Sequence, residues 1–408
     1  MKLTSFSALL LLVGSTILQA EDWLQWRGPT RDGFAAASPK WPATLAGLKQ
    51  LWRVELDPSY SGPLVIGDKV ITTASKDKTL EVVKALDRTT GKELWSVEWE
   101  GFQKVPFFAA SNGDWIRATP VSDGAHVWVA GMRDVLVCLE VKTGKEIWRL
   151  DFVKETNSAP PTFGFVCSPL LDGEFLYVQA GGAFCKLEKA TGKLVWKSLA
   201  DGGGMNGSAF SSPIITEIAG TRQLVVQTRK DLCGVNPKDG SVLWTQPIKT
   251  FQGMNILTPV VKQDRIFTSA YGGVTQGFEL TKQGPSLSLQ EKWQKKGEAY
   301  MSTPVIIAGK VFLHLRNERF TCFDLLTGEQ HWTTSEKFGK YMSLVAQGDR
   351  ILALDQRGIL LLIKANPEKF ELLEQKKISE QDTWAHLAIA GNRLYIRELK
   401  GLTAWEWK

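Results

Sequence analysis

A short phrase recurs along this chain and constrains its fold more than any other feature. It reads Ala-Leu-Asp-Arg-Thr-Thr-Gly-Lys-Glu-Leu-Trp at 85–95 and returns at 138–148, 186–196, 234–244 and 322–332. The constant parts are an apolar residue, a Thr-Gly or Asp-Gly pair, and a Trp four residues after the Gly. A repeat spacing of roughly 45 residues is typical of a solenoid or a propeller built from copies of one small unit.

Each copy predicts two strands joined by a tight hairpin, whose Gly takes the positive φ that other residues resist. The Trp opens the second strand, and we expect the repeated Trp side chains to wedge between neighbouring units. Upstream, a Ser or Thr precedes two more apolar runs separated by a Gly or Asp turn, so each unit has four antiparallel strands. This upstream element occurs at Ser61, Thr119, Ser168, Ser212, Thr258, Thr303 and Ser343, and in degenerate form at Ala385-His386-Leu387.

The two ends of the chain complete one another. The eighth unit supplies strands only at 387–390, 394–398 and 402–407, and it lacks the Trp strand. A spare strand, Gln50 to Leu56, precedes the first full unit, and pairing it with the last strand would leave no open sheet edge. The sequence therefore predicts an all-β fold, an eight-bladed β-propeller of four-stranded antiparallel blades, closed by its N- and C-terminal strands and occupying residues 50–408.

The first 49 residues divide into two segments. Residues 1–20 contain Lys2, an apolar run and Leu-Gln-Ala before Glu21, the layout of a cleavable secretory signal peptide. The apolar run is too short to span a bilayer, and no Cys follows it. We expect a periplasmic or secreted protein, soluble after signal cleavage and monomeric. Residues 21–49 form a turn-rich arm with two Trp and two Arg at its start, which we expect to lie across the side of the propeller.

Composition excludes several functions. The net charge of +6 is mild for 408 residues and includes no basic run, so we expect no nucleic-acid partner. The four His are scattered, and the five Cys fit small buried core positions better than a redox or metal site. We predict no metal site, because the carboxylates and amides near the inner strands lack the spacing of a hard-cation site. These polar residues are Asn112, Asp114, Asn206, Asn255 and Asp382.

The Ala-Leu-Asp-x-x-Thr-Gly-Lys-x-x-Trp phrase, with the Ser-Pro strand before it, resembles the pyrroloquinoline-quinone (PQQ) repeat of quinoprotein dehydrogenase-like propellers. The resemblance covers about residues 50 to 408. It implies either a PQQ-dependent dehydrogenase or a quinone-free propeller such as the lipoprotein that assists outer-membrane β-barrel assembly. The alcohol dehydrogenases of the family imply two adjacent cysteines, a Trp beneath the quinone, a Glu and Asn for Ca²⁺ and an Asp base, and no Cys-Cys pair occurs here.

A ring of bulky side chains is predicted at one mouth of the central channel, because every inner strand begins near the same end. Aromatic, Met and Arg side chains are enriched where proteins bind partners. The alternative is that they only plug the channel. An insertion with Phe102, Phe107, Phe108 and Trp115, and a glycine-rich stretch at 201–207, are expected nearby. The ring comprises Tyr60, Arg117, Phe163, Phe165, Phe210, Met254, Asn255, Tyr300, Met301, Tyr341 and Trp384.

The leading hypothesis is a non-catalytic exported propeller without a cofactor that binds a protein or peptide-like partner at this mouth, in envelope or outer-membrane protein assembly. No catalytic residue is assigned. The second hypothesis is a PQQ-dependent enzyme, with Ca²⁺, that oxidises an alcohol or sugar. The third is a carbohydrate-binding propeller, because aromatic rings suit sugar faces.

Overall fold

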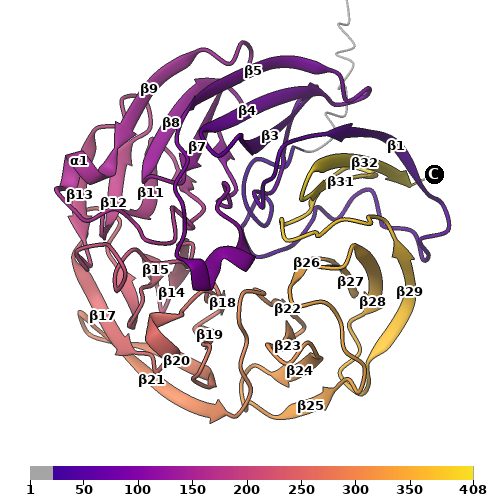
Figure 1. Cartoon of the computed structure of the whole chain (residues 1–408). Coiled ribbons are helices and arrows are strands. Elements are labelled where there is room, and N and C mark those ends of the chain that lie inside the picture. Colours follow the sequence, from indigo (N-terminus) through magenta and orange to yellow (C-terminus); the bar gives the residue numbers. More distant parts are fainter. Residues whose placement is uncertain (1–21, 408) are drawn as a thin grey trace, which may run out of the picture.

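The computed structural model describes residues 22–407, so the predicted signal peptide lies outside the described residues. Residues 22–407 form eight four-stranded antiparallel sheets that stand in a ring around a central channel (Figure 1). The innermost strands of neighbouring sheets contact one another around this channel. The predicted eight-bladed β-propeller is confirmed.

Each blade is numbered by its place in the chain. Blade one comprises β2 (Leu64–Ile66), β3 (Lys69–Lys76), β4 (Leu80–Asp87) and β5 (Glu93–Glu100), and blade two comprises β6 (Val121–Ser122), β7 (His126–Gly131), β8 (Val135–Glu140) and β9 (Glu146–Asp151). Blade three comprises β10 (Leu170–Asp172), β11 (Phe175–Ala180), β12 (Ala183–Glu188) and β13 (Leu194–Ser198), and blade four comprises β14 (Ile214–Ile218), β15 (Thr221–Gln227), β16 (Asp231–Val235) and β17 (Val242–Pro247). Blade five comprises β18 (Val260–Lys262), β19 (Arg265–Ser269), β20 (Thr275–Gln283) and β21 (Ser286–Lys295), and blade six comprises β22 (Val305–Ile307), β23 (Lys310–His314), β24 (Phe320–Asp324) and β25 (Gln330–Thr333). Blade seven comprises β26 (Met342–Gln347), β27 (Arg350–Asp355), β28 (Ile359–Lys364) and β29 (Glu371–Lys377), and blade eight comprises β30 (Ala388–Ala390), β31 (Arg393–Glu398), β32 (Gly401–Trp407) and β1 (Leu48–Glu55).

Blade eight contains both ends of the propeller. Strand β1 pairs antiparallel with β32, from Leu48 opposite Trp407 to Glu55 opposite Gly401. The sheet order β1-β32-β31-β30 places the N-terminal strand outermost. The predicted closure is confirmed, with a strand that begins two residues earlier than expected.

The repeated phrase forms a turn that fastens one blade to the previous one. In blade one, Asp87 Oδ1 accepts hydrogen bonds from the backbone N–H groups of Thr89 and Thr90, and Gly91 then adopts a φ of +74°. In blades two, three, four and six the turn Gly packs against the Trp of the preceding blade; a Cβ on Gly192 would lie 2.6 Å from the Trp148 ring. The Trp148 Nε1–H also donates to the Lys189 carbonyl oxygen at 3.0 Å. The predicted wedging of the Trp side chains between blades is confirmed at this seam.

The repeated Ser or Thr forms a belt of hydrogen bonds around the channel. Its hydroxyl oxygen accepts the backbone N–H of the equivalent residue in the preceding blade, as between Thr119 N and Ser168 Oγ at 3.0 Å. The belt runs from Gly62 through Thr119, Ser168, Ser212 and Thr258 to Thr303. These contacts hold the starts of the innermost strands in register.

The N-terminal arm enters the channel instead of lying across the propeller's side, so that expectation was wrong. Trp23 forms a β-bridge with Val65 of blade one, and Phe34 forms one with Ala346 of blade seven. The Arg27 guanidinium donates to the carbonyl oxygens of Thr303 and Pro304 in blade six, at 2.8 and 2.6 Å. The arm therefore crosses the channel, because guanidinium donors can satisfy inner-strand carbonyls that lack strand partners.

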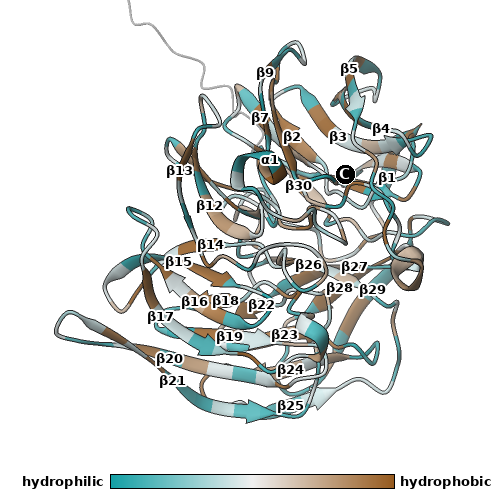
Figure 2. Cartoon of the chain, turned by 60° about the vertical axis from the view of Figure 1, so that its left-hand side comes forward, coloured by the Kyte–Doolittle hydropathy of each residue, from teal (hydrophilic) through white to brown (hydrophobic). Residues whose placement is uncertain are grey.

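The polypeptide folds differently at the two ends of the channel. The Thr-Gly turns and the arm lie at one end, whereas the hairpins between second and third strands lie at the other. At the second end an insertion forms the 3-10 helix η1 (Phe107–Asn112), and the short helix α1 (Phe152–Thr156) follows β9. Within residues 22–407 no helix is long and apolar enough to cross a membrane. Figure 2 shows hydrophobic segments in inner strands such as β2 and β7, and more hydrophilic ones in outer strands such as β17 and β21.

Candidate binding cavity at the channel mouth

The channel end opposite the arm opens into a cavity of about 920 Å³. One residue from every blade lines it, always two positions before the belt residue or its equivalent. Because these positions are equivalent in the repeat, their side chains point toward the same axis. The eight residues are Tyr60, Arg117, Val166, Phe210, Ile256, Met301, Tyr341 and Trp384.

Nine of the eleven residues predicted for the mouth line this cavity: Tyr60, Arg117, Phe163, Phe210, Met254, Tyr300, Met301, Tyr341 and Trp384. Phe165 and Asn255 do not. Phe165 is buried among Phe152 and other core residues of blades two and three. Asn255 is fully buried and donates from Nδ2 to the Thr228 carbonyl oxygen at 3.1 Å. Both stand three positions before the belt, and because Tyr300 at the equivalent position of blade six does line the cavity, this position alone does not fix which side chains face the axis.

The lining also contains residues that the sequence reasoning missed. Arg229, Tyr271 and Arg316 stand at the hairpins between the second and third strands of blades four, five and six. Phe251 and Gln252 come from the connection between blades four and five. The first three occupy comparable places in consecutive units, which is the signal that would have found them.

The predicted insertion and glycine-rich stretch reach the same mouth. Phe108 and Asn112 of η1 line the cavity, as do Met205 and Asn206. Phe107 on the same helix is 90% exposed, and it packs edge-to-face against Phe108. The rim of the cavity is therefore apolar and open to solvent on the side of blades one and two.

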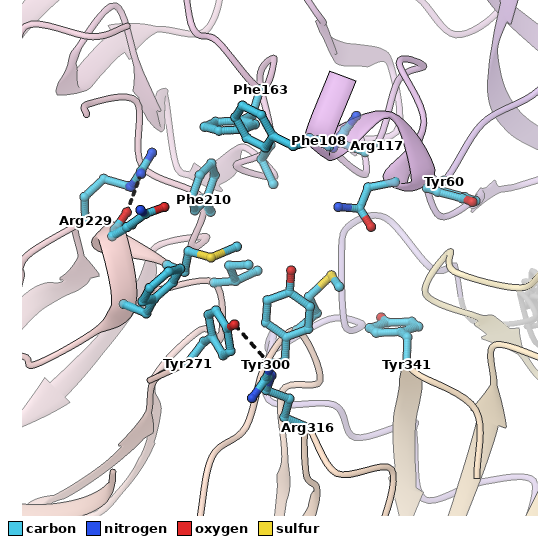
Figure 3. Close-up of a pocket in the computed structure, with 18 of the residues that line it drawn as sticks. Tyr60, Phe108, Arg117, Phe163, Phe210, Arg229, Tyr271, Tyr300, Arg316 and Tyr341 are labelled. Carbon is cyan, nitrogen blue, oxygen red and sulfur yellow. Dashed lines mark hydrogen bonds between the residues drawn. The ribbon is translucent and has the colours of Figure 1, made fainter. Parts of the chain in front are cut away.

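Aromatic rings form a continuous wall over blades seven, eight and one. Tyr341 stacks on Trp384 with ring centroids 5.6 Å apart, and Trp384 lies 5.7 Å from Tyr60. Tyr60 in turn packs against Trp115 of the insertion at 5.3 Å. Such pairs contribute free energy beyond that of burying their area. A second group, Phe163 and Phe210, lies on the opposite side in Figure 3.

Three guanidinium groups face the cavity in different states (Figure 3). Arg229 donates to the carbonyl oxygens of Gly253, Gly207 and Gln252, and its guanidinium stacks 4.3 Å from the centre of the Phe210 ring. Arg316 donates to the Tyr271 hydroxyl oxygen at 3.1 Å. Arg117 donates only to the Gly113 carbonyl oxygen among the described residues. Burial lowers the pKa of Arg117 to about 10 and also lowers that of Arg229, yet both stay charged at neutral pH.

The tyrosines supply neutral donors. Burial raises the pKa of Tyr60 to about 12 and also raises the pKa values of Tyr300 and Tyr341. All three hydroxyls therefore keep their protons at physiological pH. Together with the guanidiniums they make the cavity rich in hydrogen-bond donors.

The lining residues do not fit a calcium-bound quinone. Ca²⁺ takes six or more oxygen ligands, with carboxylates prominent among them. The cavity lining includes neither a carboxylate nor an imidazole, so it offers only amide and phenol oxygens and no general base. Across residues 22–407, no group of three His, Cys, Asp or Glu is arranged to hold a metal ion. No catalytic step through a quinone is derived from these residues.

Comparison with known proteins places this architecture among relatives. The chain is 21% identical over 329 residues to the outer membrane protein assembly factor BamB of Yersinia pestis, covering 78% of each chain. The polyvinylalcohol dehydrogenase of a Sphingopyxis species is 27% identical over 44% of this chain, but over only 28% of its own length. The crystal structure of BamB from Moraxella catarrhalis superposes with a TM-score of 0.63 at 16% identity, covering 89% of this chain and 98% of that one.

The relative matched over most of its length is thus an assembly factor, whereas the dehydrogenase match is confined to part of a larger protein. The family described as "Outer membrane protein assembly factor BamB" (PQQ_2) matches residues 80–334, more than half of the chain. With its Thr-Gly turns, seam tryptophans and eight closed blades, this chain belongs to that family.

Proposed function

We propose that this protein is a non-catalytic, cofactor-free scaffold of outer-membrane protein assembly, and that a segment of a partner protein docks in the mouth cavity. One observation carries the proposal: the cavity combines aromatic, Met and Arg side chains with a lining free of carboxylate and imidazole. Aromatic and Arg side chains dominate binding energy at protein interfaces, whereas a dehydrogenase needs a base at its reacting centre.

The rim supports the same function. Phe107 is 90% exposed and Phe108 is 60% exposed, and Met205, which lines the same cavity as Phe108, is 45% exposed. Large apolar side chains left in water on a rigid rim are characteristic of a surface that a partner covers. The relatives named as outer membrane protein assembly factors support this setting. In this proposal the chain is exported through its N-terminal signal and acts as a monomer.

Site-specific photo-crosslinking in the native envelope tests the proposal. A benzophenone amino acid replaces Phe108 at the mouth, and Leu326, 54% exposed in the turn between β24 and β25, is the matched apolar control. We expect mass spectrometry to identify outer-membrane assembly proteins crosslinked at Phe108 and not at Leu326. Equal crosslinking at both positions, or partners unrelated to the outer membrane, would contradict the proposal.

The quinone alternative has its own test. We expect the mature protein, incubated with PQQ and Ca²⁺, to show neither bound-quinone absorbance nor dye-linked oxidation of alcohols or sugars. Turnover of either an alcohol or a sugar would contradict the proposed scaffold function and support a PQQ-dependent enzyme.

A further inference from the structure

The mouth cavity has an unbalanced charge. Arg117, Arg229 and Arg316 face it, and its lining includes no carboxylate. Arg316 lies 3.5 Å from Glu298, which offsets its charge. Arg229 is 5% exposed and donates to three carbonyl oxygens, and it forms no ion pair with a described carboxylate, although Asp201 acts on it at longer range. A buried cation of this kind favours the approach of an anion.

Arg117 is the guanidinium of the cavity with the fewest of its N–H donors bonded to described residues. A guanidinium carries five N–H donors, and only one hydrogen bond, from Nη2 to the Gly113 carbonyl oxygen, is made to the described residues. Its Nε is buried without a partner there. Tyr60 also lines the cavity, near enough to Arg117 to influence the pKa of its guanidinium, and the Tyr60 hydroxyl makes no hydrogen bond with residues 22–407 either. Arg117 and Tyr60 are therefore two neighbouring donors of the lining that have few acceptors among the described residues.

The donors determine the class of ligand. Sugar hydroxyls both donate and accept, and carboxylate acceptors for them are missing from the lining. A carboxylate only accepts, and it pairs with a guanidinium in a short, strong, often bidentate contact. The nearby Asp114 and Asp382 lie outside the lining, and Asp382 already accepts a hydrogen bond from Gln356.

We propose that the cavity binds an acidic segment of the partner protein, with a Glu or Asp carboxylate on Arg117 and Tyr60 and a flanking aromatic side chain against the stacked Trp384 and Tyr341 rings. A volume of about 920 Å³ admits a few side chains and no folded domain. This inference rests on the proposed function, because it names the chemistry of the segment that docks at the mouth.

Two end-capped, fluorescein-labelled peptides test it, one with the sequence Ala-Phe-Glu-Phe-Ala and one with Gln in place of Glu. Fluorescence anisotropy with the mature wild-type protein should show the Glu peptide binding about 10-fold more tightly, the effect expected of one charge-assisted hydrogen bond. Arg117→Gln should remove this preference. Tyr60→Phe, which deletes only a hydroxyl, should reduce it and leave folding unchanged.

The control variant is Lys340→Gln, which removes one positive charge from an exposed side chain next to Tyr341 and outside the lining. It should keep the preference for Glu. Equal affinities for the two peptides in wild type, or no binding of either, would overturn the inference. So would an equal loss in Lys340→Gln and Arg117→Gln, because the charge would then act only at long range.

The outcome is separable from that of the crosslinking. Crosslinks to assembly proteins at Phe108 together with equal peptide affinities would leave the proposed function standing and remove the acidic segment. A clear preference for the Glu peptide without such crosslinks would support recognition of an acidic segment and contradict the proposed function in outer-membrane protein assembly.

Discussion

The two ends of the channel are built on the same eight innermost strands and differ in how their polar groups are satisfied. At the arm end, Arg27 is fully buried and its guanidinium is saturated by carbonyl oxygens, including those of Thr303 and Pro304. At the mouth, Arg117 has a single partner among the described residues. Saturated donors hold a structure together, and unsaturated donors facing a cavity are available to a ligand. The difference separates the stabilising end of this propeller from its binding end.

The largest loss of stability is expected from a substitution at the arm end of the channel. Arg27→Ala should lower the free energy of unfolding by about 3 to 5 kcal/mol, because it leaves buried carbonyl oxygens without donors and opens a void. Arg117→Ala at the mouth should cost less than about 1 kcal/mol. Urea denaturation of both variants measures the contrast, and similar losses would mean that the two ends are not functionally distinct.

The next largest loss of stability is expected from a substitution at the seam between blades two and three, because this seam belongs to the channel wall that both ends share. Trp148→Ala removes a half-buried ring that packs on Gly192 and donates to the Lys189 carbonyl oxygen, so we expect a loss of about 3 kcal/mol. Ile147→Ala, at a neighbouring side chain that is 45% exposed, is the control and should cost less than about 1 kcal/mol. A loss at Trp148 no greater than the control would show that the ring is not wedged between blades.

The seam between blades one and two contains a buried carboxyl group on the mouth side, from which we predict a pH dependence of stability. Glu81 is buried and accepts a hydrogen bond from Trp99 Nε1 at 2.8 Å, and burial raises the pKa of its carboxyl from 4.5 to about 7. A raised carboxyl pKa means that the folded state binds the proton more tightly than the unfolded chain. The stability it contributes is therefore present below pH 4.5 and is lost as pH rises from about 4.5 to 7.

Glu81→Gln should remove this dependence. Between pH 4.5 and 7.5 the wild type should lose on the order of 2 kcal/mol relative to the variant, judged by urea midpoints across that range. The exposed Glu100→Gln is the control and should track the wild type. Parallel curves for wild type and Glu81→Gln would refute the assignment.

The smallest change in stability is expected from a substitution at the mouth of the channel. Tyr300→Phe deletes a hydroxyl that faces the cavity and bonds no described residue, so its free energy of unfolding should stay within about 0.5 kcal/mol of wild type. Thermal melting detects the difference. A larger loss would show that the mouth is packed for stability, as the plug alternative holds.

The sequence predicted the blades well because each unit carries its own local signals. Asp87, the Thr residues after it and Gly91 specify the turn without reference to the rest of the molecule. Closure followed from counting strands. The site was predicted in part, because the prediction selected bulky or functional side chains that precede the inner strands. Val166 and Ile256 face the cavity although they are small, and Phe165 does not although it is large.

The course of the arm could not be predicted. Arg27 and Arg31 bind backbone carbonyl oxygens, which every residue possesses, so no complementary residue in the sequence marks their destination. Arg229, Tyr271 and Arg316 each stand two residues after the second strand of their blade, and they were missed because only residues before the inner strands were considered.

The pairing of β1 with β32 sets the order in which the molecule can be completed. Domains of a chain that emerges from its N-terminus generally fold as their residues become available. Here the arm and β1 emerge before every blade, yet their partners include blade seven and residues 401–407. Strand β1 is thus made before blade one but can be paired only after residues 401–407 have appeared, and the ring stays open until then.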